Sequence, residues 1–164
     1  MCIAMNRIVY CLTMMASQTL AIQAVASSEN SIFVGDTAIE ADTELNLVVE
    51  GIDVSRPGSI MVMLFAQSGF PKEHDKALDT QILPVEHSKL SFSFTKVPSE
   101  FAIKVLHDED NSQKVTKNWT QIIPAEGLGF SNGAKLGFGP PSFKQAKLKK
   151  NQQLGTISIR IIYP

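Results

Sequence analysis

The feature that most constrains the fold is a two-residue alternation of apolar and polar side chains. Residues 90–95 read LSFSFT, and residues 157–163, ISIRIIY, begin with the same alternation. Successive side chains of a β-strand point to opposite faces, so this period is typical of half-buried strands and not of a helix. The sequence therefore predicts a β-sheet protein.

Further strands follow from the same pattern. Alternation predicts strands at 45–50 and 101–105, whereas 60–65 is apolar on both faces, as expected for a central strand. Edge strands are predicted at 81–87, which contains a proline, and at 143–148, which is interleaved with lysines.

These seven short strands are separated by turn-rich segments, which predicts an all-β fold, an antiparallel β-sandwich. Only residues 71–78 have a helical pattern, and it is short.

The first 26 residues are predicted to be a secretory signal peptide. Arg7 is the only charged residue before Glu29, residues 8–16 are largely apolar, and Ala24-Val25-Ala26 fits a signal peptidase site. The apolar stretch is too short for a permanent membrane anchor, so no transmembrane span is expected in the mature chain. We expect the protein to be exported and to be periplasmic or secreted; an N-terminal core helix is the alternative.

Cleavage after Ala26 would remove both cysteines, Cys2 and Cys11. The mature chain would then have no disulfide, no thiolate nucleophile and no cysteine metal ligand. Residues 27–44 are predicted to form an acidic linker or a loose first strand, and residues 45–164 the β-sandwich domain.

The formal net charge of −1 gives no basic field for nucleic acid. This value hides an asymmetry, because residues 27–53 contain seven acidic and no basic residues, whereas 127–164 contain six basic and no acidic ones. Either the first and last strands are neighbours with opposite charges, or a basic face binds an anionic partner such as a glycan or lipid headgroups.

No catalytic constellation is convincing, so a non-enzymatic protein is predicted. Residues 129–133 match the G-x-S-x-G pattern of serine hydrolases, but flanking glycines and prolines indicate a loop and not the strand and helix that this motif needs. A hydrolase using Ser131 with a histidine remains an alternative. His107 is expected at the edge of the core, hydrogen-bonded to a loop.

Asp108, Asp110 and Ser112 place oxygens at every second position, as at the start of a calcium loop. The glycine and the later acid of such a loop are missing, since Thr116 and Lys117 stand where an acid is needed. The segment is either a weak calcium site or a solvated polar turn, and no other cofactor is predicted.

Several blocks in order resemble a known family. They include VEGI at 49–52, SIMVMLF at 59–65, HDE at 107–109, IPAEGLGFSN at 123–132 and FGPPSF at 138–143. On these blocks, residues 45–148 resemble the bacterial exported family called domain of unknown function 2141. The resemblance implies an immunoglobulin-like or prealbumin-like β-sandwich without an assigned activity. Relatives carry glycines and a closing aspartate after HDE; residues 110–116, DNSQKVT, lack both.

The long Gly/Pro-rich loop from 107 to 143 is the candidate recognition surface, or else a packed cover over one end of the sandwich. Trp119 is expected to pack this loop onto the sandwich, together with Phe130, Phe138 and Phe143. The ligand or surface-loop candidates are His107, Asp108, Glu109, Trp119, Phe130, Ser131 and Asn132.

The sequence thus predicts an exported β-sandwich module that binds or supports an envelope protein or glycan. The alternatives are a calcium-stabilised adhesion module and the Ser131 hydrolase.

Overall fold

The computed structural model describes residues 44–119, 123–152 and 155–164. The predicted signal peptide and all but the last residue of the acidic segment lie outside the described residues. The strands are β1 (Leu45–Glu50), β2 (Ser59–Phe65), β3 (Asp79–Pro84), β4 (Lys89–Phe94), β5 (Glu100–Asp108), β6 (Gly127–Phe130), β7 (Leu148–Lys149) and β8 (Ile157–Arg160). The short helical elements are η1 (His74–Lys76), η2 (Ser131–Gly133), α1 (Phe143–Ala146) and η3 (Lys150–Gln152).

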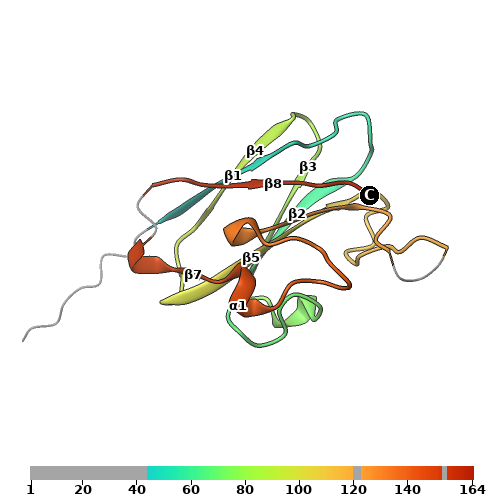
Figure 1. The fold of residues 1–164 in the computed structure, drawn as a ribbon. Helices are drawn as coiled ribbons and strands as arrows, with labels where there is room; N and C mark the ends of the chain where they lie inside the picture. Colours follow the sequence, from blue (N-terminus) through green and yellow to red (C-terminus); the bar gives the residue numbers. More distant parts are fainter. Residues whose placement is uncertain (1–43, 120–122, 153–154) are drawn as a thin grey trace, which may run out of the picture. The chain divides into compact units, whose positions relative to one another are not determined.

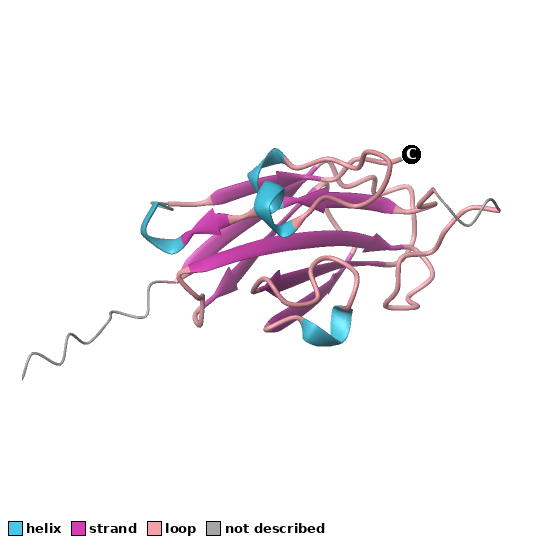
Figure 2. Ribbon diagram, turned by 60° about the horizontal axis from the view of Figure 1, so that its bottom comes forward, coloured by secondary structure: helices cyan, strands magenta, loops and turns pink. Residues whose placement is uncertain are grey.

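The eight strands form two sheets, which confirms the predicted all-β, sandwich-like fold (Figure 2). The smaller sheet has the order β4-β1-β8; the larger has the order β3-β2-β5-β6, with β7 also paired to β5. β1 pairs with β8 in parallel, so the sandwich is not wholly antiparallel. β3, which contains Pro84, lies at an edge as predicted.

The parallel β1–β8 pair makes the first and last strands neighbours. Glu50 of β1 lies 2.9 Å from the Lys89 Nζ and 3.9 Å from an Arg160 guanidinium nitrogen. The first of the two explanations for the charge asymmetry therefore fits the described strands. Such exposed pairs contribute only about 0–1 kcal/mol each.

The main core lies between the two sheets. Inward side chains of β1, β4 and β8 meet those of β2 and β5, and alternate residues along each strand supply them. The buried apolar residues of this core are Leu45, Leu47, Val49, Ile52, Ile60, Val62, Leu64, Phe92, Phe94, Val97, Phe101, Ile103, Val105, Ile159 and Ile161.

The outer face of the larger sheet is also covered. Met61, Met63 and Phe65 of β2 pack there with Leu106 and with β6, so β2 is buried on both faces, as its apolar run predicts. In Figure 1, η1 and α1 lie on the side of β5 away from β1 and β8. Because of this outer layer, both faces of β5 are buried, and side chains on its outer face lie beneath the covering segments.

Two predicted elements are different in the structure. Residues 143–148 form α1 followed by the short β7, because Ser142 and Gln145 make a capping box that starts a helical turn. Only His74–Lys76, a single 3-10 turn, is helical within 71–78.

β6 is a strand that the sequence did not predict, and it interrupts the expected long loop. Gly127 and Gly129 have low strand propensity, but here they allow close approach of the C-terminal segment. A Cβ on Gly127 would lie 2.4 Å from the Tyr163 ring, and one on Gly129 would lie 2.9 Å from Ile159. Glycine is therefore required for packing at these two positions, not for a turn.

Candidate ligand-binding cleft

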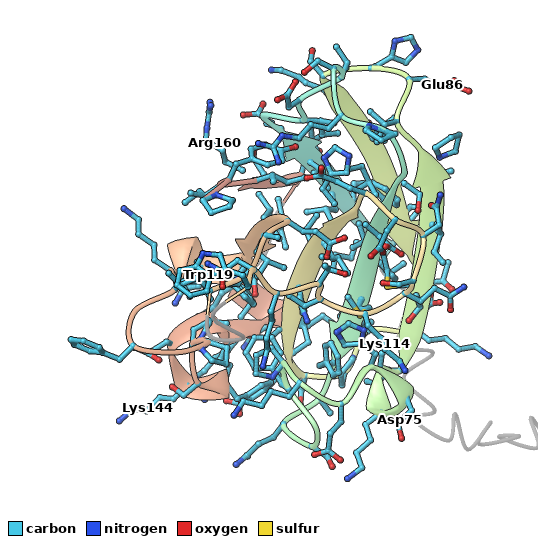
Figure 3. The ribbon with its side chains drawn as sticks, turned by 90° about the vertical axis from the view of Figure 1, so that its right-hand side faces the viewer. Asp75, Glu86, Lys114, Trp119, Lys144 and Arg160 are labelled. Atoms are coloured by element: carbon cyan, nitrogen blue, oxygen red, sulfur yellow. The ribbon has the colours of Figure 1, made fainter. Side chains whose placement is uncertain are left out.

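A cleft of about 1200 Å³ lies on the outer face of the larger sheet. The η1 turn, the segment after β5 and the segment after β6 surround it, and we call it the Lys104 cleft. Its apolar lining includes Val115, Ile123, Leu128, Phe130, Leu136 and Phe138. Its charged or titratable lining comprises Lys72, Glu73, His74, Asp75, Lys104, Lys114 and Lys117. Figure 3 shows Lys114 above the η1 turn that carries Asp75.

Lys104 lies in the middle of β5, with Met63 of β2 and Phe130 of β6 as its register partners. The side chain is only 3% exposed. Its Nζ donates to the Pro71 carbonyl oxygen at 3.0 Å and lies 2.6 Å from the His74 Nε2. A lysine is rarely buried to this extent without a charged partner, so this ammonium is the most unusual group in the cleft.

His74 is held in one tautomer by its partners. Its Nδ1 lies 2.9 Å from the Gln113 carbonyl oxygen, which can only accept, so Nδ1 carries the proton. Nε2 then has a free lone pair and accepts from the Lys104 ammonium. Burial and the charge of Lys104 lower the pKa of His74, which keeps the ring neutral near pH 7.

Burial also lowers the pKa of Lys104, from 10.5 to about 8, against a smaller opposing effect of Glu126. The direction follows from desolvation, which disfavours the charged form of a buried base. At neutral pH the group is still mostly protonated. The cleft therefore has a positive charge at its floor and apolar walls above it.

A second group of ionisable residues lies at the end of β5. Ligand oxygens of Asp108, Asp110 and Glu126 all lie within 4.8 Å of one another. Glu126 was not predicted as a member of this group. It reaches the two aspartates because Lys117 and Pro124 form an antiparallel β-bridge that folds the chain back.

The oxygens of these carboxylates already accept hydrogen bonds from the loop. Asp108 accepts from the Ser112 and Gln113 amides at 3.0 and 2.7 Å, and Glu126 accepts from the Glu109 and Thr116 amides at 3.1 and 2.8 Å. These bonds fix the turn without any cation.

The two flanking carboxylates have opposite pKa shifts. Hydrogen bonds from the Ser112 and Thr116 hydroxyls lower the pKa of Asp110 to about 2. Burial raises the pKa of Glu126, and the charges of Asp110 and Asp108 add to this rise. A cation placed between them would relieve the repulsion among the three carboxylates.

Four of the predicted surface candidates, His107, Asp108, Phe130 and Ser131, are in fact buried. His107 is fully buried, with Nδ1 2.7 Å from the Tyr163 hydroxyl and Nε2 3.0 Å from the Pro57 carbonyl, so it is tied to a loop as expected but is not a surface residue. Phe130 is buried in β6, against Phe70. Ser131 is completely buried, and Asp108 is 1% exposed.

The Ser131 hydroxyl has a structural role in the described part of the chain. Oγ accepts from the Ile103 amide at 2.8 Å and donates to the Ala146 carbonyl oxygen at 2.6 Å. It therefore links η2 to β5 and α1. A hydroxyl without solvent access whose proton is bound to a backbone carbonyl is poorly placed for nucleophilic attack.

The remaining candidates are spread apart. Glu109 is half-buried and pairs with Arg56 at 2.8 Å. Asn132 is exposed, has a positive φ of 56° and donates to the Gln145 carbonyl oxygen. Trp119 is 92% exposed and Phe138 is fully exposed, so the prediction that both pack onto the sandwich is wrong. Phe143 does pack, against Phe70.

Lys104 and His74 were not predicted as site residues. Alternation along β5 suggests that Lys104 faces solvent, but its neighbours on that face, Ala102 and Leu106, are apolar. A lone lysine between two apolar residues on one strand face was the available signal. It indicates a covered face with one buried charge.

A model of the family described as "Uncharacterized protein conserved in bacteria (DUF2141)" matches residues 47–158. The chain belongs to this family. The match confirms the resemblance seen in the sequence. The matched residues include Lys104 and every described residue that lines the cleft. No curated protein and no solved structure matches the chain.

No helix among the described residues is long and apolar enough to cross a membrane.

Proposed function

We propose that this DUF2141 protein is an exported, non-enzymatic binding module of the bacterial envelope, whose small-molecule ligand occupies the Lys104 cleft. The observation that carries the proposal is the cleft itself, about 1200 Å³ with apolar walls and one buried charge. Small-molecule sites are typically concave and mostly apolar, with a few polar groups that orient the ligand. The predicted signal peptide supports export.

The described site favours binding over catalysis. Ser131 is occupied by backbone hydrogen bonds. His74, the only histidine among the described residues that line the cleft, faces Lys104 and not a hydroxyl nucleophile. An envelope protein or a glycan as a partner of the loop from 107 to 143, which carries the exposed Trp119, remains a prediction.

The proposal is tested with the neutral apolar dye Nile red. We expect saturable dye fluorescence with the wild-type protein and weaker binding by Leu136→Asp, which places a charge in the cleft lining. Leu83→Asp on β3 is the matched control, because Leu136 and Leu83 are similarly exposed, at 42% and 36%, and only Leu136 lines the cleft. Equal dye binding by the wild type and Leu136→Asp would contradict a ligand site there.

The second candidate function is a calcium-stabilised adhesion module. One observation favours it: Asp108, Asp110 and Glu126 present oxygens within 4.8 Å of one another, and calcium prefers such oxygen ligands. Calcium should then raise the melting temperature of the wild type, and this rise should be lost in Asp110→Asn. A melting temperature that does not respond to millimolar calcium would exclude this function.

A further inference from the structure

Among the described residues, the buried Lys104 ammonium has no carboxylate at ion-pair distance, although the charge of Glu126 acts on it from further away. Its two hydrogen-bond acceptors are the Pro71 carbonyl oxygen and the neutral His74 ring. A buried charge is strongly disfavoured unless it is paired. An anion bound in the cleft would provide the negative partner that the described residues do not place beside Lys104.

The Lys104 ammonium has one further N–H group that can donate a hydrogen bond to such an anion. A lysine ammonium has three N–H groups, and the two partners named above account for two of them. Lys104 lines the cleft, so the third can serve a ligand there.

The charged residues around the opening of the Lys104 cleft also favour a negatively charged ligand. Three lysines line the cleft besides Lys104, namely Lys72, Lys114 and Lys117, compared with two acidic residues, Glu73 and Asp75. Glu73 is itself paired with Lys76 at 2.7 Å.

The number and type of cationic groups indicate a single negative charge. No arginine is among the described residues that line the cleft, and one ammonium reaches its floor. A single lysine ammonium acts as a point charge of +1, which matches the single negative charge of a carboxylate. The apolar walls require that the rest of the ligand be apolar.

Resting on the proposed function, we propose that the Lys104 cleft binds a small apolar molecule with one carboxylate. The carboxylate accepts a hydrogen bond from the Lys104 ammonium, and the hydrocarbon part lies against Leu128, Phe130 and Leu136. The ligand is a monomer taken from solution and not a headgroup in a membrane.

The pH dependence of binding follows from the groups that face Lys104. These are Lys72, Glu73, His74, Asp75, Lys114 and Lys117 of the cleft lining, and Glu126 before β6. Burial lowers the pKa of Lys104 itself to about 8. Carboxylate binding should therefore weaken as the pH rises from 7 to 10, because the ammonium loses its proton.

The test is calorimetric titration of the protein with dodecanoate, below the concentration at which it forms micelles, and with the neutral dodecanol. We expect dodecanoate to bind more tightly than dodecanol, and Lys104→Met to weaken dodecanoate binding by about tenfold or more while leaving dodecanol unchanged. Lys96→Met, at an exposed lysine outside the cleft, should bind like the wild type.

The other outcomes separate the two proposals. Equal affinity for dodecanoate and dodecanol, unaffected by Lys104→Met, would overturn the carboxylate inference but leave the cleft as a binding site. Failure of both ligands to bind, together with equal Nile red binding by Leu136→Asp, would overturn both proposals. Binding to phosphatidylglycerol vesicles without binding to monomeric dodecanoate would also overturn the inference, in favour of a membrane surface.

Discussion

Replacement of the buried lysine, Lys104→Met, has a measurable consequence for the pH dependence of stability. Methionine keeps much of the length of the aliphatic stem and removes the charge. In the wild type, the pKa falls from 10.5 to about 8 on folding because of burial. Between these two values the unfolded chain binds more protons than the folded one, so the free energy of unfolding rises with pH.

The magnitude follows from the size of the shift. A pKa difference from 10.5 to about 8 corresponds to about 3 kcal/mol of disfavoured charge in the folded state. Of this, about 2 kcal/mol is relieved between pH 7 and pH 9.5, where the folded protein loses the proton and the unfolded chain mostly retains it. The free energy of unfolding should therefore rise by about 2 kcal/mol more in the wild type than in Lys104→Met.

The assay is urea denaturation followed by far-ultraviolet circular dichroism at the two pH values. Trp119 fluorescence is a poor probe, because this side chain is 92% exposed in the folded protein. Titrating groups whose pKa does not depend on Lys104 affect the wild type and the variant alike and cancel in the difference, and Lys96→Met should retain the wild-type rise. Parallel pH profiles for the wild type and Lys104→Met would refute the assignment of a buried ammonium.

Three further predictions concern other parts of the chain. Ser131→Ala should lower the free energy of unfolding by about 1–3 kcal/mol, because the buried Ile103 amide loses its acceptor; an unchanged urea midpoint would contradict this. Gly127→Ala should destabilise by about 1–3 kcal/mol through the Tyr163 ring, whereas Gly137→Ala, with nothing within 4 Å of the added Cβ, should not; equal melting temperatures would contradict the packing role. Expression of the full chain in a Gram-negative host should yield a protein that begins at Ser27 in the exported fraction; an intact Met1 terminus on cytoplasmic protein would exclude the signal peptide.

Local sequence patterns were sufficient to predict most strands of the two sheets. The alternation in β4 and β8 and the apolar run of β2 predicted strands, because these signals depend only on neighbouring residues. β6 was missed for a physical reason. Its two glycines are needed because Ile159 and Tyr163 approach closely, and these residues lie 30 and 36 positions after the glycines that they contact.

The candidate site was predicted only in part. Asp108, Asp110 and Ser112 do form one turn, since their contacts are local in sequence. Lys104 and Glu126 were missed because their burial depends on distant segments that fold over the outer sheet face. The period of a strand predicts two faces but does not reveal which of them a later segment will cover.

The most direct test of the central claim is an NMR titration of the Lys104 side chain, with and without dodecanoate. We expect a pKa of about 8 in the free protein and a higher value with the carboxylate bound, because the anion stabilises the ammonium. A pKa of Lys104 that dodecanoate leaves unchanged would contradict the claim that this cleft pairs a buried lysine with a carboxylate ligand.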